Sequence, residues 1–299
     1  MYNGIVVVNK GSGFTSFDVV AKMRGIFGQK KIGHTGTLDP DATGVLPVCL
    51  GNATKVCELL TGADKEYEAQ MILGVTTDTQ DISGNVLCRR PAEELRDEDV
   101  IRALDAFRGT ISQIPPMYSA LKVNGKKLCD LARAGKVIER QPREVTVHEL
   151  EILSMNLPVL TFRVRCSKGT YVRTICHDLG ETLGCGGTLT GLKRLRSGCF
   201  SLADSFSLDE LQEKKEKGEL EEVLLSVDRI FSDCPALQTF EETDKKLLNG
   251  AKLDAEDVRS LQQTVEPGRV RMYDSAGIFR AIYVREEKNE VYRPLKMFL

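Results

Sequence analysis

The order of hydrophobic and polar residues at the start of the chain predicts a strand, a loop and a helix. Residues 5–8 are a short run of β-branched residues, which is typical of a strand. Thr15 and Ser16 follow a polar stretch and precede apolar residues that recur at helical spacing. Those apolar residues are Val19, Val20, Met23 and Phe27.

Two later segments alternate with the period of a strand. The first places Tyr67, Ala69, Met71 and Leu73 on one mostly apolar face. The second, residues 159–167, places apolar Leu160, Phe162, Val164 and Cys166 on one face. Its other face carries Arg163 and Arg165, so this strand is expected to have a basic face.

Helices and loops are predicted between and after these strands. Residues 97–107 have helical spacing, begin with acidic residues and are followed by Gly109, which predicts a helix. A turn at residues 168–170 leads into a second helix, with apolar residues spaced four apart. Residues 31–51 are rich in glycine and polar residues, and residues 114–128 form an unusual segment, so both are expected to be loops.

The C-terminal part of the chain changes in character. Residues 208–223 hold seven acidic and three basic residues and predict a solvated helix pair broken at Gly218. From about Pro235 onward, short β-rich runs alternate with turn signals, which fits a small β-barrel of about 60 residues. We therefore expect one domain over residues 1–232 and a second over residues 233–299.

Charge and composition restrict the possible partners. With 41 Lys and Arg against 43 Asp and Glu, the formal net charge of the 299-residue chain is -2. No global positive field draws it to nucleic acid or membrane, so a polyanion site must be a local patch. Residues 161–200 offer one, because seven basic and two acidic residues give this segment a charge of +5.

Cysteine and histidine usage indicates a reduced compartment and no metal. The nine cysteines are scattered without a CxxC pair, and the three histidines have no HxxxH spacing. We therefore expect reduced thiols and no structural metal. The chain also lacks a signal-peptide pattern and any apolar stretch near the roughly 20 residues that span a bilayer, which predicts a cytoplasmic location.

Asp39 is the sharpest candidate for chemistry. It lies among Gly33, Gly36 and Gly44, where backbone can approach a ligand closely. Asp39-Pro40-Asp41 can instead be a simple turn whose side chains bond their own backbone. The segment DPDAT also matches the DxDxT pattern of Mg²⁺-dependent phosphohydrolases, but the residues before it do not form the buried strand which that fold requires.

Three further residues have both a functional and a structural interpretation. Arg173 begins a helix and can reach a buried carboxylate such as Asp39, although most arginines are solvated surface residues. Tyr67 is either a core residue of its strand or a platform that stacks on a nucleobase. His34, beside glycine, is either a wedge into RNA or a loop hydrogen-bonding group.

Six segments, taken in order, resemble the motif series of the TruB family of bacterial tRNA pseudouridine synthases. They read NKGSGFTSFDVV, GHTGTLDPDATGVLPVCLGNATK, DKEYEAQMILGVTTDTQD, IPPMYSALKVNGKKLCDLARAG, CSKGTYVRTICHDLG and LTGLKRLRSG. The resemblance covers most of residues 1–200, and the tail is more weakly similar to a PUA-type RNA-binding barrel. It implies an α+β fold with a mixed, largely antiparallel sheet and flanking helices.

The resemblance also implies an activity and residue roles. The activity is isomerisation of uridine 55, in the T loop of tRNA, after base flipping, with no cofactor, no membrane and no obligate protein partner. The catalytic aspartate, tyrosine and arginine of the family fall on Asp39, Tyr67 and Arg173. The residue that fills the space of the flipped base falls on His34, the uracil contact on Asp81 and the pocket-lining leucine on Leu192.

Basic residues are predicted to contact the RNA. The residues assigned to substrate or phosphate binding are Lys10, Lys122, Lys126, Arg194 and Arg196. One departure from the family pattern follows Lys10, where Gly11 replaces the usual proline and puts the stiffness of that turn in doubt. The alternatives that stay open are a tRNA-binding or tRNA-folding protein without catalysis and, more remotely, the phosphohydrolase.

Overall fold

The computed structural model describes residues 1–123, 125–261, 268–285 and 291–299. Its centre is one ten-stranded sheet with the order β14-β1-β3-β12-β4-β11-β10-β7, to which β2 and β13 add at β3 and β12. All pairs are antiparallel except β1–β14 and β3–β12, which are parallel. The strands are β1 (Gly4–Lys10), β2 (Ile32–His34), β3 (Thr43–Leu50), β4 (Lys65–Leu73), β7 (Gly109–Gln113), β10 (Arg143–Asn156), β11 (Val159–Cys166), β12 (Gly187–Ser197), β13 (Phe200–Ser201) and β14 (Ser205–Phe206).

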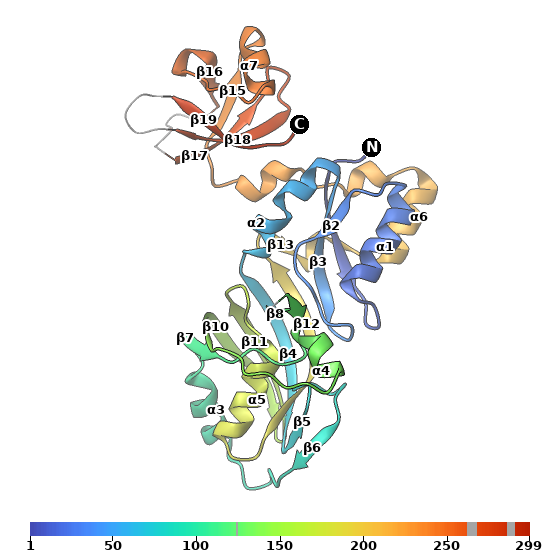
Figure 1. The fold of residues 1–299 in the computed structure, drawn as a ribbon, viewed down its shortest axis with the longest axis vertical. Coiled ribbons are helices and arrows are strands. Elements are labelled where there is room, and N and C mark those ends of the chain that lie inside the picture. The colour runs from blue at the N-terminus through green and yellow to red at the C-terminus, as the bar shows by residue number, and fades with distance from the viewer. Residues whose placement is uncertain (124, 262–267, 286–290) are drawn as a thin grey trace.

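Among the described residues, six helices and two small hairpins accompany this sheet. The helices are α1 (Ser16–Phe27), α2 (Cys57–Thr61), α3 (Asp97–Asp105), α4 (Leu128–Arg133), α5 (Val172–Thr182) and α6 (Leu208–Lys217), whereas α7 (Asp244–Leu248) packs on the C-terminal sheet. The hairpins are β5 (Val75–Thr77) with β6 (Val86–Arg89) and β8 (Lys122–Val123) with β9 (Lys126–Lys127). Figure 1 shows α1 and α6 together beside one half of the sheet, and α3 and α5 beside the other half. The predicted mixed, largely antiparallel α+β fold is therefore confirmed.

Local sequence accounts for the first helix. Thr15 caps α1 by accepting a hydrogen bond from the backbone N–H of Asp18, whose carboxylate accepts one from the Thr15 N–H in return. The apolar face predicted from the sequence is buried against β1 and β3. Gly28 then ends the helix in the left-handed conformation that glycine adopts without strain.

The predicted alternation of β4 and β11 is also confirmed. The apolar residues of both strands face the core that α3 and α5 cover. They are Ala69, Met71, Leu73, Leu160, Phe162, Val164 and Cys166, each at most 2% exposed.

The prediction of one loop over residues 31–51 is wrong. The segment contains β2 and β3, and only residues 35–42 form a loop between them. Leu46, Val48 and Leu50 pack toward α1, whereas Val45 and Cys49 pack into the cluster on the opposite face. A strand that is buried on both faces has no polar alternation, so its sequence pattern gives little sign of a strand. The prediction of one loop over residues 114–128 is also wrong, because this segment contains β8 and β9. Residue 124 lies outside the described residues.

The C-terminal residues form a separate five-stranded sheet with the order β16-β15-β17-β18-β19. Its strands are β15 (Ala236–Thr239), β16 (Val258–Ser260), β17 (Gly268–Tyr273), β18 (Phe279–Arg285) and β19 (Tyr292–Met297). An isolated bridge between Leu253 and Tyr292 links β19 to the chain before β16. Ile282 and Phe298 of the C-terminal part belong to one buried apolar cluster with Ile5 of β1 and Val45 of β3. The two sheets therefore share part of their apolar core.

The acidic segment before this sheet also follows the prediction in outline. Ser207 and Glu210 form a capping box at the start of α6, and Gly218 ends the helix in the left-handed conformation. Leu211, Leu220 and Val223 are buried against α1, so this acidic segment is solvated only on its outer face. No helix in the described part of the chain is long and apolar enough to cross a membrane.

Candidate active site

The N-terminal end of α1 holds the loop that carries Asp39 in place. Ser16, at the start of α1 and 2% exposed, accepts a hydrogen bond from the Leu38 N–H at 2.9 Å and donates one to the Leu38 carbonyl at 3.3 Å. The Ala42 N–H donates to the Asp39 carbonyl at 3.1 Å. The backbone on both sides of Asp39 is therefore held, and its half-exposed side chain projects from a fixed point.

Lys10 also holds this loop, which corrects its predicted role in substrate binding. The side chain is fully buried, and its Nζ donates to the carbonyls of Gly11 at 2.9 Å, Phe14 at 2.7 Å and Pro40 at 2.9 Å. An ammonium group has three donors, so none remains for the RNA. Burial lowers the pKa of Lys10 to about 8. These bonds also supply rigidity to the turn in which Gly11 replaces the family's proline.

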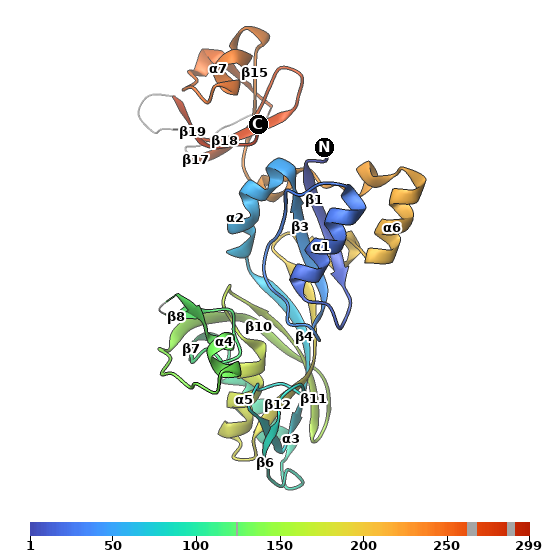
Figure 2. The ribbon, with the colours of Figure 1, turned by 45° about the vertical axis from the view of Figure 1, so that its right-hand side comes forward.

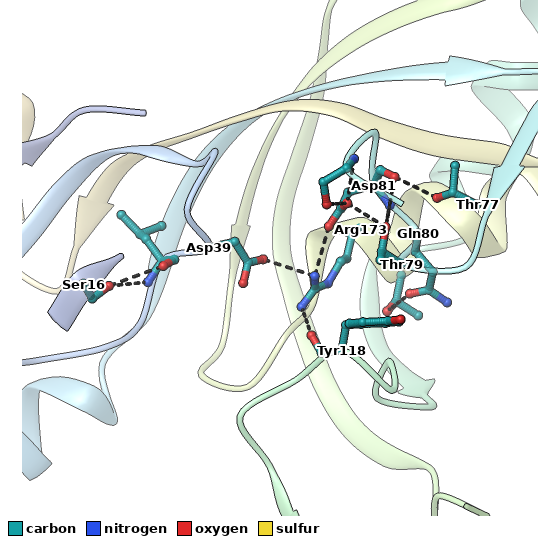
Figure 3. A network of polar contacts seen from close by, with 11 residues as sticks. Ser16, Asp39, Thr77, Thr79, Gln80, Asp81, Tyr118 and Arg173 are labelled. Atoms are coloured by element: carbon teal, nitrogen blue, oxygen red, sulfur yellow. Dashed lines mark hydrogen bonds and ion pairs between the residues drawn. The ribbon is translucent and has the colours of Figure 1, made fainter. Parts of the chain in front are cut away.

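Arg173 connects the Asp39 loop to a second carboxylate. Its Nη1 lies 3.3 Å from Asp39 Oδ2 and 3.1 Å from Asp81 Oδ2, and its Nη2 donates to the Tyr118 carbonyl at 2.6 Å. Figure 3 shows the guanidinium group between the two carboxylates. The side chain is 7% exposed, so the predicted ion pair with Asp39 is present and is shielded from water on the arginine side.

Burial and the neighbouring charges shift the pKa of Asp39 in opposite directions. Removal from water raises the pKa of Asp39, the Arg173 charge lowers it, and the nearby Asp81 carboxylate raises it again. The net direction is upward. The ionised form of Asp39 therefore depends on Arg173, and this coupling gives the pair a chemical role that a surface salt bridge lacks.

Asp81 is bonded to its own loop as well as to Arg173. Its Oδ1 accepts from the Thr79 hydroxyl at 2.7 Å, from the Ser83 N–H at 3.1 Å and from the Ser83 hydroxyl at 2.5 Å. Burial raises the pKa of Asp81, but these bonds and Arg173 outweigh it, so the net shift is downward. In this arrangement Asp81 is an ionised support for Arg173.

Sequence reasoning missed Gln80, which fixes the same loop. Gln80 is the non-glycine residue with positive φ (65°) in the described part of the chain, a conformation that costs free energy outside glycine. Its side-chain oxygen accepts a hydrogen bond at 2.8 Å from Thr174 of α5, next to Arg173. Tyr118 was missed because it acts through its backbone carbonyl, which has no sequence signature.

Two cavities meet at Asp39 and Arg173. The first has a volume of about 520 Å³ and extends toward Asp81 and Tyr118. The second, of about 310 Å³, extends toward Tyr67 and Lys65. Leu192 lines both cavities and Arg194 lines the second, so the structure brings together six of the predicted site residues.

Tyr67 and His34 differ in their relation to these cavities. Tyr67 lines the second one from β4, and burial raises its pKa, so the phenol is neutral near pH 7. His34 ends β2 outside the lining of both cavities, and its Nδ1 accepts a hydrogen bond from the Gly36 N–H at 3.4 Å. Its ring also meets the exposed ring of Phe17 edge to face at 5.9 Å.

The remaining residues that were predicted to contact RNA differ in exposure and in ion pairing. Lys122 and Lys126 are exposed on the β8–β9 hairpin, outside the two cavities. Arg196 is exposed but lies 3.5 Å from the carboxylate of Glu66. Arg194 is 1% exposed, so it cannot contact a phosphate in this conformation, and that prediction is corrected.

The basic face of β11 is also less positive than its sequence indicates. Arg163 lies near Glu66 of β4 and Glu151 of β10, and Arg165 lies 2.7 Å from Glu149 of β10. The sum of +5 over residues 161–200 is correct, but the acidic partners lie on neighbouring strands outside that segment. This face is therefore a layer of cross-strand ion pairs.

One thiol reaches the site, because Cys129 of α4 lines the first cavity. All nine cysteines are free. Among the residues that the structure describes, no group of three or more His, Cys, Asp or Glu side chains is arranged to hold a metal ion. The loop before Asp39 is preceded by the three-residue strand β2, so it also lacks the buried strand that the phosphohydrolase alternative needs.

Comparisons with known proteins assign the family. Residues 24–172 match the N-terminal domain of the TruB family pseudouridylate synthases, and residues 173–232 match the C-terminal domain of tRNA pseudouridylate synthase B. The tRNA pseudouridine synthase B of Lachnoclostridium phytofermentans is 48% identical over 99% of this chain and 100% of the relative. That of Clostridium kluyveri is 41% identical over 99% of this chain and 100% of the relative.

A solved structure gives the same assignment at the level of the fold. One chain of a Cbf5-Nop10-Gar1 complex has a TM-score of 0.73 and 26% identity, and the match covers 99% of this chain and 85% of that chain. Sequence relatives of nearly equal length and a full-length structural match thus agree with the geometry around Asp39. The protein belongs to the TruB family of pseudouridine synthases.

Proposed function

We propose that this TruB family member converts uridine 55, in the T loop of tRNA, to pseudouridine, with Asp39 as the carboxylate that acts on the ribose. The observation that carries the proposal is the Asp39–Arg173 pair, which stands where two cavities meet. The printed names of the relatives support tRNA as the substrate. Position 55 and the T arm rest on the six sequence motifs.

The residues fit the bonds that must change. The C1′–N1 bond of the uridine breaks, the uracil turns, C1′ bonds to C5, and the C5 hydrogen leaves as a proton while N1 gains one. The reaction is redox neutral. The ionised Asp39 can trap or stabilise the cleaved ribosyl group, and Arg173 keeps that carboxylate charged and directed.

The second cavity can hold the extruded base. Tyr67 and Leu192 both line it, so an aromatic ring and an aliphatic side chain are available to the two faces of a uracil. Extrusion of a base costs a few kcal/mol, and less in a loop than in a duplex. In this proposal Tyr67 stacks on the uracil, and His34 occupies the space that the base leaves.

The exposed basic residues and the C-terminal sheet would supply RNA affinity. Lys122 and Lys126 are free of ion pairs among the described residues and stand beside the first cavity's wall at α4. We propose residues 1–232 as the catalytic domain and residues 233–299 as a PUA-like RNA-binding domain. The separate five-stranded sheet and the end of the family match at residue 232 support this division. Bacterial tRNA is a cytoplasmic substrate, so the proposal places the reaction in the cytoplasm.

The position of the reaction is tested with transcripts that carry tritium at C5 of uridine. The proposal predicts one tritium released per tRNA, and none from a matched transcript with cytidine at position 55. A hairpin of the T arm alone should also react. Equal release from both full-length transcripts would contradict position 55.

The alternatives give different results in the same assay. A tRNA-binding protein without catalysis would bind both transcripts and release no tritium. A phosphohydrolase would release phosphate from a generic ester only with Mg²⁺, and EDTA would abolish that activity. The proposal predicts tritium release in the presence of EDTA.

A further inference from the structure

Arg194 is a buried cation at the junction of three strands. It lies opposite Tyr67 in the β12–β4 register and opposite Gly44 in the β12–β3 register. A side chain at Gly44 would collide with the Arg194 backbone, since its Cβ would lie 2.2 Å from the Arg194 carbonyl oxygen. Glycine therefore lets β3 approach β12 closely and closes the sheet over this arginine.

The guanidinium group of Arg194 has backbone partners in place of a carboxylate. Its Nε donates to the Val45 carbonyl at 2.7 Å, and its Nη2 donates to the Gly36 carbonyl at 3.2 Å. Within the described residues, no carboxylate lies within ion-pair distance of it. A buried charge without a counterion is costly to keep, so a neutral residue of the same size would stabilise the fold better if packing were the only requirement.

The partners of Arg194 belong to two parts of the site. Gly36 lies three residues before Asp39 in the same loop, and Val45 is a fully buried residue of β3. On the β4 side, Tyr67 lies directly opposite Arg194 in the strand register, and both side chains line the second cavity. One planar group thus bonds to the loop of the carboxylate and lies beside the aromatic ring that lines this cavity.

We propose that Arg194 is a positioning residue, which fixes the Tyr67 hydroxyl and ring relative to the Asp39 loop; this inference rests on the proposed function. A guanidinium group has five donors in a rigid plane, so it can hold the Gly36 and Val45 carbonyls in different directions while it faces Tyr67 across the strand pair. An ammonium group at this position keeps the charge but not the plane.

The test compares rates and affinities of substituted proteins. Arg194→Lys and Arg194→Met are assayed for single-turnover tritium release at saturating tRNA, and their tRNA Kd is measured at several salt concentrations. A matched control is Arg229→Lys, where Arg229 Nη2 donates to Asp204 Oδ1 at 2.6 Å and the guanidinium group lies 5.8 Å from the centre of the Phe200 ring. This control changes an arginine beside an aromatic ring that lies outside the lining of both cavities.

The inference predicts that both Arg194 variants lose about 10-fold to 100-fold in the saturated rate, as for a displacement of about 1 Å in an active site. Their Kd and its salt dependence should stay within twofold of the wild type, and the control should keep the wild-type rate. A double-mutant cycle with Tyr67→Phe should be non-additive, since removal of the hydroxyl removes one of the groups that Arg194 positions.

Several results would overturn the inference. A weaker Kd with a smaller salt slope would make Arg194 a phosphate contact. Additive effects with Tyr67→Phe, an unchanged rate, or failure of both Arg194 variants to fold would leave it a structural residue only. A wild type that releases no tritium would contradict the proposed function itself, whereas a normal wild-type rate with unaffected variants would contradict only this inference.

Discussion

The basic side chains around the active site are buried, whereas those on the β8–β9 hairpin are exposed to solvent. Lys10, Lys65 and Arg194 are each at most 7% exposed and donate to backbone carbonyls. Lys122 and Lys126 are exposed, on a hairpin that Figure 2 shows next to α4 at the outside of the molecule. The buried group holds the geometry of the site, and in the proposed function the exposed group contacts RNA phosphates.

Free energy explains this division of roles. A buried cation has lost its hydration, so its donors are already committed to carbonyl acceptors and its position is fixed. An exposed lysine keeps its hydration and can release counterions from a phosphate when it binds. Substitutions in the two groups should therefore change different quantities, and the following predictions test that difference.

The largest effect is expected for Asp39→Asn. The amide cannot act as a carboxylate toward the ribose, so the rate of tritium release should fall by at least about 1000-fold. The tRNA Kd should stay near the wild-type value, because Asp39 makes no phosphate contact in the proposal. Folding should not suffer: the pKa of Asp39 is raised in the native state, so its ionisation above the unfolded pKa of 3.8 opposes folding. A Kd that rises in parallel with the loss of rate would contradict this assignment.

Arg173→Gln should have the next largest effect, about 100-fold in rate at neutral pH. The substitution removes the charge that lowers the pKa of Asp39, so that pKa rises further. Since the ionised carboxylate is the active form, the acidic limb of the pH–rate profile should move to higher pH. An unshifted limb, measured from the single-turnover rate across pH, would show that Arg173 does not control the ionisation of Asp39.

Lys10→Met should chiefly reduce stability. The substitution leaves the carbonyl groups of Gly11, Phe14 and Pro40 without their donor. The free energy of unfolding should fall by at least about 2 kcal/mol, as measured by urea denaturation. If stability is unchanged while tRNA affinity falls, Lys10 contacts the substrate and the comparison drawn above fails.

The smallest effect is expected for the double substitution of Lys122 and Lys126 by alanine. The tRNA Kd should weaken about 10-fold near physiological salt, and the slope of its logarithm against that of salt concentration should decrease by about 2. The rate at saturating tRNA should not change. A lower saturated rate with an unchanged Kd would place these lysines in the chemistry.

Much of the fold could be predicted from periodicity, because one face of most elements is polar. The helix α1 and the strands β4 and β11 follow this rule. The strand β3 does not, since both of its faces are buried, and Gly44 is there for the close approach of β12 rather than for a turn. Local sequence cannot show what covers a strand.

The site shows the same division between local and tertiary information. Motif order identified Asp39 and Arg173 as candidates for pairing, and the structure pairs them. The burial of Lys10 and Arg194 could not be predicted, because it depends on elements distant in sequence. The support from Gln80 comes from a strained backbone turn, which side-chain identity does not specify.

The central claim is that the chain catalyses pseudouridine formation, and tritium release from C5 of uridine in a tRNA transcript tests it most directly. The assay uses wild-type protein with EDTA present throughout, because the new bond from C1′ to C5 must expel that hydrogen. The account predicts one tritium released per tRNA. Tight tRNA binding with no release of tritium would contradict it and leave a tRNA-binding protein.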